Sequence, residues 1–175
     1  FMKGSSIYLS AKSLDGLRAY VLGFDRKDIS GKNKIYMFFK SMYRKGFDDL
    51  PYLLNPMEWQ INAFNNTLNT GIEHSYTYKN GSGNINLGLR STALMSDYNY
   101  QSISMNTINR TRIGKLTLNT RVILQYGSGN NWASESSLFL AGANPEELME
   151  NKYTRAQGFF DPEWAKIGAQ TNYFQ

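Results

Sequence analysis

The sequence predicts an all-β fold: an antiparallel up-and-down transmembrane β-barrel, present as a segment of a larger barrel, with one short helix in a long loop. Three observations predict it. Apolar and polar residues alternate over segments much longer than the roughly 5–6 residues of an ordinary soluble strand. Turn residues, and no helical patterns, separate these segments up to about residue 141. Aromatic residues make up 14% of the chain and gather near the predicted strand ends.

Composition excludes several kinds of site. The chain has 175 residues, which is enough for one domain with its own core. It has no cysteine, so disulfides and thiolate metal sites are excluded, and His74 is its single histidine. The 19 Lys and Arg and 14 Asp and Glu give a net charge of +5, spread from Lys3 to Lys166. Because nucleic-acid binding needs a concentrated basic stripe, no nucleic-acid partner is expected.

Hydropathy points to strands as the membrane-crossing elements. No apolar run is long enough for a transmembrane helix. A barrel strand needs only about 9–11 residues, every second one apolar, which is compatible with a mean hydropathy of −0.48. The first residues, "FMKGSS", lack the pattern of a secretion signal. We expect that such a signal has been removed, or that the chain is a piece of a longer protein.

The first predicted strands cover "GLRAYVLGFDRK" and "KIYMFFKSMYRK", residues 16–27 and 34–45. In the first strand, the alternation does not decide which face is apolar, because both alternating sets are apolar. One set is Tyr20, Leu22 and Phe24, and the other is Leu17, Ala19 and Val21. The second places Ile35, Met37, Phe39, Ser41 and Tyr43 on one face, and Lys34, Tyr36, Phe38, Lys40, Met42 and Arg44 on the other.

A hairpin is predicted next. "TLNTGIEHSYTYK" (67–79) alternates, and the same parity continues back to Asn62, so the strand is expected to begin before Thr67. Asn80 and Gly81 favour a type I′ turn. The partner strand, "NINLGLRSTA" (84–93), has Ile85, Leu87 and Leu89 opposite Asn86, Gly88 and Arg90.

The last predicted strands are a weak one at 101–109 and a long one within "GKLTLNTRVILQYGSG", residues 114–129. The alternation in the long strand holds from Leu116 to Tyr126 with one lapse, at Ile123. Composition changes near Ala141, so we divide the chain into strands and hairpins (1–141) and a long loop of the same barrel (142–175). A helix over about 144–155 is predicted in this loop, with Asn144 as its N-cap.

In a membrane barrel, the alternation along each strand predicts which residues face lipid and which face the lumen. The predicted lipid-facing residues are Leu68, Ile72, Ile85, Leu87, Leu89, Leu116, Leu118, Val122 and Leu124. The predicted lumen-facing residues are Glu73, Arg90, Asn119, Arg121 and Gln125. The predicted interface aromatics are Trp59, Tyr76, Tyr78, Tyr126 and Trp132.

No catalytic, cofactor or metal site is predicted. Glu73 and His74 have opposite parity in their strand, so they cannot share a ligand. The two "GSGN" stretches follow strands and are explained by hairpin turns, because a phosphate loop must open a helix. A group of acidic residues is interpreted as solvated helix capping rather than a calcium site: Glu146, Glu147, Glu150, Asp161 and Glu163.

Three stretches carry a resemblance: "FKSMYRKGFDDLPYLLNPMEWQ" (39–60), "LNTGIEHSYTYKNGSGNINLGLRS" (68–91) and "ESSLFLAGANPEELMENKYTR" (135–155). They resemble the carboxy-terminal barrel of a Bacteroidota envelope protein family in which the barrel follows a zinc aminopeptidase-like (gluzincin) region. "SLFLAG" also resembles the strand entering the inward loop of the outer-membrane insertase and surface-antigen superfamily. The resemblance covers most of residues 35–175. The chain lacks the Arg-Gly-aromatic motif of that loop and any metallopeptidase motif.

The resemblance implies location in the bacterial outer membrane and a role as membrane anchor and scaffold, with a lumen used for export or assembly. The partners are then the lipid bilayer and the remainder of the barrel or a partner envelope protein. Two alternatives stay open. One is the non-catalytic tail of an outer-membrane zinc aminopeptidase-like enzyme, and the other is a soluble extracellular β-domain that binds glycan through exposed Tyr and Trp.

Overall fold

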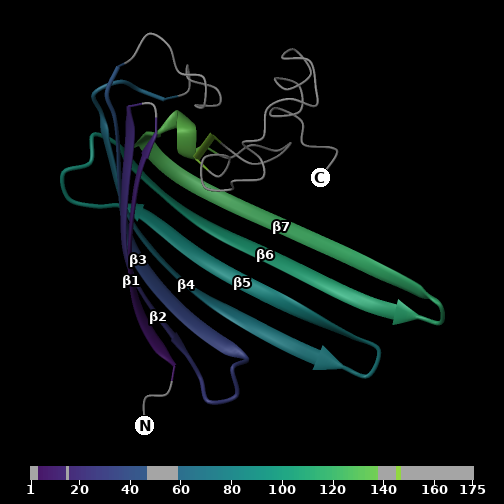
Figure 1. Cartoon of the computed structure of the whole chain (residues 1–175). Helices are drawn as coiled ribbons and strands as arrows, with labels where there is room; N and C mark the ends of the chain where they lie inside the picture. Colours follow the sequence, from purple (N-terminus) through teal and green to yellow (C-terminus); the bar gives the residue numbers. More distant parts are fainter. Residues whose placement is uncertain (1–3, 15, 47–58, 138–144, 147–175) are drawn as a thin grey trace.

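The computed structural model describes residues 4–14, 16–46, 59–137, 145 and 146. They form one seven-stranded antiparallel sheet in which each strand pairs with its neighbours in sequence (Figure 1). The strands are β1 (Ser5–Leu14), β2 (Leu17–Lys27), β3 (Asn33–Arg44), β4 (Phe64–Tyr78), β5 (Gly81–Thr92), β6 (Asn99–Ile113) and β7 (Leu116–Asn131). The all-β, up-and-down prediction is confirmed. The sheet is open, with β1 and β7 as its edges.

The strands are long, from 10 residues in β1 to 16 in β7. The pairing between neighbours is continuous, with one irregularity between Asn99 and Tyr100. β1 lies within the predicted strand region but was not identified as a strand from the sequence. β4 begins at Phe64, before Thr67, as its parity predicted.

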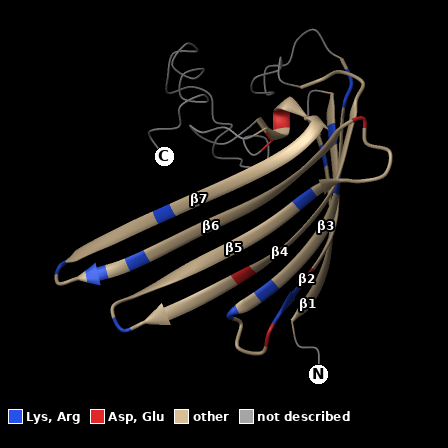
Figure 2. Cartoon of the chain, turned by 180° about the vertical axis from the view of Figure 1, so that it is seen from behind, with Lys and Arg blue, Asp and Glu red and all other residues tan. Residues whose placement is uncertain are grey.

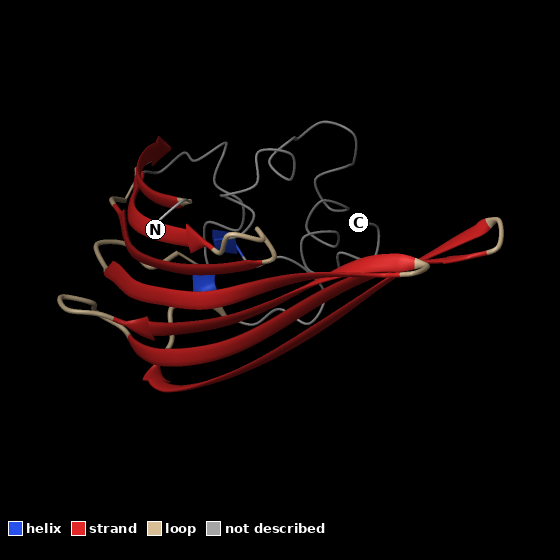
Figure 3. Ribbon diagram, turned by 90° about the horizontal axis from the view of Figure 1, so that it is seen from below, coloured by secondary structure: helices blue, strands red, loops and turns tan. Residues whose placement is uncertain are grey.

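The sheet has two different ends. At one end, which we call the turn end, short connections at 28–32, 79–80 and 114–115 join β2 to β3, β4 to β5 and β6 to β7. At the opposite, loop end, the connections include residues 93–98, and a short 3-10 helix, Ser134–Ser136, follows β7. The sheet curves around the side on which the short helical segments lie (Figure 3). We call this side the concave face and the other the convex face.

The turn between β4 and β5 differs from the predicted type I′ turn. Tyr78 pairs with Gly81, so the two central residues are Lys79 and Asn80. Neither has a positive φ, which a type I′ turn requires at both positions. Gly81 belongs to the strand, where a Cβ would lie 2.2 Å from the carbonyl oxygen of Arg110. The glycine is therefore needed for close packing and not for turn conformation.

Pairing with β3 settles the faces of β2. Leu17 is buried against Met42 and Trp59 on the concave face. Leu22 pairs with Phe39 and is 55% exposed on the convex face. A second small cluster contains Ala63, Tyr98, Tyr100 and Ala133, all buried. Both clusters lie at the loop end, so the described core is small and most large apolar side chains lie outside it.

Candidate functional site

The two faces of the sheet differ sharply in charge. Paired residues on neighbouring antiparallel strands point to the same face, so the register assigns every strand position to one side. The convex face contains two charged residues, Arg18 and Arg26, both near the ends of β2. The other charged strand residues share the concave face: Lys12, Asp25, Lys27, Lys34, Lys40, Arg44, Glu73, Arg90, Arg110, Arg112 and Arg121.

The residues predicted to face lipid all lie on the convex face. Register places Leu68, Ile72, Ile85, Leu87, Leu89, Leu116, Leu118, Val122 and Leu124 there. Pairs such as Ile72 with Leu87 and Leu124 with Met105 make this face continuous across strands. Leu89 and Leu124 are 57% and 58% exposed, so the face has no cover among the described residues. The predicted lumen-facing residues share the concave face: Glu73, Arg90, Asn119, Arg121 and Gln125.

The predicted interface aromatics separate into two groups. Tyr76, Tyr78 and Tyr126 lie on the convex face, near strand ends. Trp59 instead is 4% exposed, buried among Leu17 and Met42, so it differs from the prediction. Trp132 also packs inside, where its ring stacks on Tyr100 with centroids 4.6 Å apart. Trp59 precedes β4 and Trp132 follows β7, and both fold back over the loop end. Alternation within the strands cannot predict the position of residues outside them.

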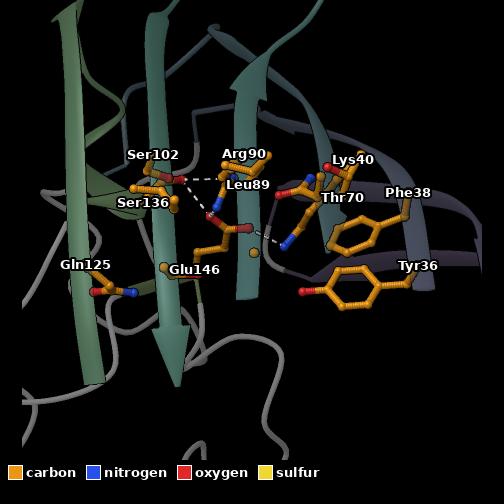
Figure 4. Close-up of a pocket in the computed structure, with 14 residues that line it drawn as sticks. Tyr36, Phe38, Lys40, Thr70, Leu89, Arg90, Ser102, Gln125, Ser136 and Glu146 are labelled. Carbon is orange, nitrogen blue, oxygen red and sulfur yellow. Dashed lines mark hydrogen bonds and ion pairs between the residues drawn. The ribbon is translucent and has the colours of Figure 1, made fainter. Parts of the chain in front are cut away.

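A buried charge cluster occupies the concave face near the loop end (Figure 4). Its centre is the carboxylate of Glu146, which contacts the Lys40 ammonium and lies 2.8 Å from Nη1 of Arg90. Ser136 donates a hydrogen bond of 2.6 Å to the same carboxylate. The side chains of Lys40 and Glu146 are 4% and 6% exposed. Glu146 therefore joins the segment after β7 to the walls formed by β3 and β5.

This geometry corrects one interpretation from the sequence. Glu146 was assigned to a solvated acidic group, but it is buried and paired with two cations. Its two partners, Lys40 and Arg90, lie on the polar faces that the alternation in their strands predicts. Of the predicted helix 144–155, Pro145 and Glu146 are described and have helical backbone. Asn144 and residues 147–155, with the other members of the acidic group, lie outside the described residues, as does the boundary at 141.

A second set of hydrogen bonds adjoins the cluster and is centred on Asn65. The Asn65 amide donates to Glu135 at 2.8 Å and to Ser136 at 3.0 Å, and it accepts a 3.0 Å bond from the Tyr100 hydroxyl. The guanidinium carbon of Arg90 lies 5.7 Å from the centroid of the Tyr100 ring, in cation–π range. Glu135 and Ser136 therefore dock onto the sheet by several directed contacts, which no sequence motif predicted.

The pKa values of Glu146 and Glu135 are shifted in opposite directions. Burial alone would raise the pKa of Glu146, but the charges of Arg90 and Lys40 outweigh it and hold that pKa well below its ordinary value. Burial raises the pKa of Glu135, although the bond from Asn65 acts in the other direction. A carboxylate with a strongly lowered pKa is a weak general base. The cluster is therefore suited to holding a segment in place rather than to acid–base catalysis.

A cavity of about 210 Å³ lies beside the cluster, on the concave face of the sheet, and is lined by residues of β3 to β7. Polar and charged side chains form much of its wall, including Tyr36, Lys40, Asn69, Arg90, Gln125 and Glu146. Tyr36 of β3 donates a 2.9 Å hydrogen bond to Asn86 of β5, across the intervening strand β4. The cavity is thus a polar space inside the curve of the sheet.

The predicted separation of Glu73 and His74 is seen in the structure. Glu73 accepts a 2.7 Å hydrogen bond from Asn84 on the concave face, whereas His74 contacts Asn33 at 2.6 Å on the convex face. Across the described ranges, no three His, Asp or Glu side chains are grouped so as to hold a metal ion. In the same residues, no helix has the length and apolarity needed to cross a membrane. Comparisons with protein-family models, curated proteins and solved structures give no match for this chain.

Proposed function

We propose that this chain is a segment of an outer-membrane β-barrel that serves as a membrane anchor and scaffold. The observation that carries the proposal is the apolar convex face, to which all seven strands contribute. Among the described strand residues, those on this face carry charge only near the ends of β2. Exposed apolar surface on this scale is rare on soluble proteins. A lipid-facing barrel wall requires it.

Strand length and topology support the same proposal. Each strand has 10 to 16 residues, sufficient to cross a hydrocarbon layer at a tilt. Lipid offers no hydrogen-bond partner to a backbone edge, so the edges β1 and β7 must pair with further strands. The remainder of the barrel or a partner envelope protein would supply those strands.

The concave face suits a polar lumen. Eleven charged strand residues point to it, and its one large described network holds Ser136 and Glu146 against the wall. We therefore assign the concave face a scaffolding role, in which a segment outside the sheet is fixed inside the barrel. An export or assembly role would use the same polar space.

A matched pair of arginine substitutions tests the membrane assignment. Leu124 and Gln125 are adjacent near the middle of β7, on the convex and concave faces respectively. An arginine on the lipid face near the bilayer midplane costs about 2–4 kcal/mol, whereas lumenal positions tolerate charge. In the complete protein, Leu124→Arg should strongly reduce folding into liposomes, and Gln125→Arg should reduce it only slightly.

The two variants have the same added charge and nearly the same strand position, so each is a control for the other. Equal tolerance would mean that β7 does not contact lipid. If the complete protein were also a monodisperse monomer without detergent, the soluble β-domain alternative would replace the barrel. The opposite ranking would reverse the assignment of the two faces.

A further inference from the structure

Basic residues lie along the turn end of the sheet (Figure 2). We define this end by residues 25–34, 73–83 and 110–119. Each of its three connections supplies one lysine: Lys32, Lys79 and Lys115. The adjoining strand ends add Arg26, Lys27, Lys34, Arg110 and Arg112. All of these except Lys34 are exposed.

Basic residues outnumber acidic ones at this end. Its eight basic residues are accompanied by three acidic ones, Asp25, Asp28 and Glu73, which leaves an excess of five positive charges. Within the three ranges that define the turn end, the structure shows one ion pair, between Lys34 and Asp25 at 3.5 Å. The Asp28 carboxylate accepts hydrogen bonds from Ser30 and Asn33. The turn end therefore carries a net positive charge, and one of its basic side chains is paired.

Aromatic rings occupy the convex face at the same level. His74 and Tyr76 have ring centroids 6.3 Å apart, and those of Tyr76 and Tyr78 are 6.2 Å apart. The Tyr78 hydroxyl donates a 3.0 Å hydrogen bond to Asn109. Apolar side chains such as Ile72 and Leu87 follow directly toward the middle of the sheet. These rings have polar edges and lie between the cations and the apolar middle of the convex face. This arrangement is expected at a membrane–water interface.

We propose that the turn end binds the headgroups of anionic phospholipids in the leaflet that surrounds it. This proposal rests on the proposed barrel function, and it adds the lipid class and the end of the sheet that recognises it. The lysines of the three connections and Arg26 provide the cations, and phosphate groups provide the complementary charge. Lysine and arginine side chains are long enough to reach headgroups from positions just beyond the apolar belt.

The geometry favours lipid over an acidic protein partner. Two of the three connections have only two residues outside their strands, at 79–80 and 114–115. They present little surface of their own beyond the sheet. The cations are also distributed along the full row of strands from β2 to β7, as expected for contact with an annulus of lipid.

The test uses the complete protein reconstituted into vesicles of phosphatidylcholine with 30% phosphatidylglycerol. These proportions are chosen as an order-of-magnitude match to an anionic leaflet, about one lipid in three. Electron paramagnetic resonance of spin-labelled phosphatidylglycerol and phosphatidylcholine measures which lipid is immobilised at the protein. The test variant is the triple substitution Lys32→Gln, Lys79→Gln, Lys115→Gln. The control triple substitution removes equal charge near the other end: Lys12→Gln, Arg18→Gln, Lys45→Gln.

We expect a several-fold preference for phosphatidylglycerol in the unmodified protein, its loss in the turn-end variant and its retention in the control. The preference should weaken in 1 M NaCl, where the screening length is about 3 Å. Inserted protein without any preference, or with equal loss in both variants, would overturn the inference while leaving the barrel proposal intact. Polyglutamate binding that depends on the three lysines, with unchanged lipid preference, would assign this end to an acidic polypeptide instead. Failure of the unmodified protein to insert would overturn the barrel proposal itself.

Discussion

The carboxylate of Glu146 lies 2.8 Å from the guanidinium of Arg90 and shares its buried site with the Lys40 ammonium. Two cations from β5 and β3 are thereby compensated by a residue that follows β7. Burying Lys40 and Arg90 without Glu146 would be costly, because a buried charge that loses its counter-ion retains its desolvation penalty. Among the contacts that dock the segment after β7, the Glu146 carboxylate is the one that compensates two buried cations.

Glu146→Gln should release that segment from the sheet. Removing one partner of a buried pair costs about 3–5 kcal/mol, so exchange of the backbone amides of Ser136 and Ser137 should accelerate by about two orders of magnitude or more. Hydrogen exchange of the complete protein in membranes measures this. Glu73→Gln, which alters a partly exposed hydrogen bond to Asn84, is the control. Unchanged exchange in Glu146→Gln would show that the ion pairs do not hold the segment.

The docking contacts should also respond to pH in two directions. The pKa of Glu146 is lowered, so its contribution is complete above its ordinary value of 4.5 and is lost as pH falls below that value. The pKa of Glu135 is raised, so its contribution is present below 4.5 and is lost as pH rises through the raised pKa. Protection of the Ser136 amide should therefore be greatest near pH 4.5 and decline on both sides.

Glu135→Gln separates the two limbs of this pH profile. The substitution removes the titrating group that weakens docking at higher pH, so the decline above pH 4.5 should disappear. The decline at lower pH, which belongs to Glu146, should persist. A profile that is unchanged by Glu135→Gln would assign the upper limb to another group.

Close packing of tyrosine over glycine gives a further prediction. A Cβ on Gly71 would lie 2.3 Å from the Tyr36 hydroxyl oxygen and 2.5 Å from the Leu87 carbonyl oxygen. Gly71→Ala should therefore lower the free energy of unfolding by about 1–3 kcal/mol through overpacking. Gly31→Ala is the contrasting variant, because its Cβ would meet open space and its cost, about 1 kcal/mol, comes from the φ of +69°. Urea unfolding of the liposome-reconstituted protein compares them, and equal effects would exclude overpacking.

Alternation was sufficient to place the residues of β4, β5 and β7 on their two faces. Leu118 and Arg121 illustrate why: the side-chain period of a strand is two, so parity alone separates them. Ile123, the one lapse, lies on the concave face beside Asn106 and is 51% exposed there. Where two parities were equally apolar, as in β2, pairing with β3 decided the faces.

The candidate site was less predictable because its parts are distant in sequence. Lys40 and Arg90 could be assigned to the polar face, but their common partner Glu146 lies in a segment with no strand periodicity. Trp59 and Trp132 looked like interface aromatics, yet each folds over the loop end into a buried cluster. Only tertiary contacts distinguish these outcomes.

The central claim is that the convex face contacts lipid, and a cysteine scan along β7 tests it most directly. The chain has no native cysteine, so each single substitution from Leu118 to Gln125 places one spin label in it, and any cysteine elsewhere in the complete protein is replaced by serine. In the complete membrane-assembled protein, oxygen, which partitions into lipid, should relax labels at Leu118, Val122 and Leu124. A water-soluble nickel chelate should relax those at Asn119, Arg121 and Gln125. We predict this two-residue alternation, whereas uniform access of the nickel chelate to all positions would contradict the claim.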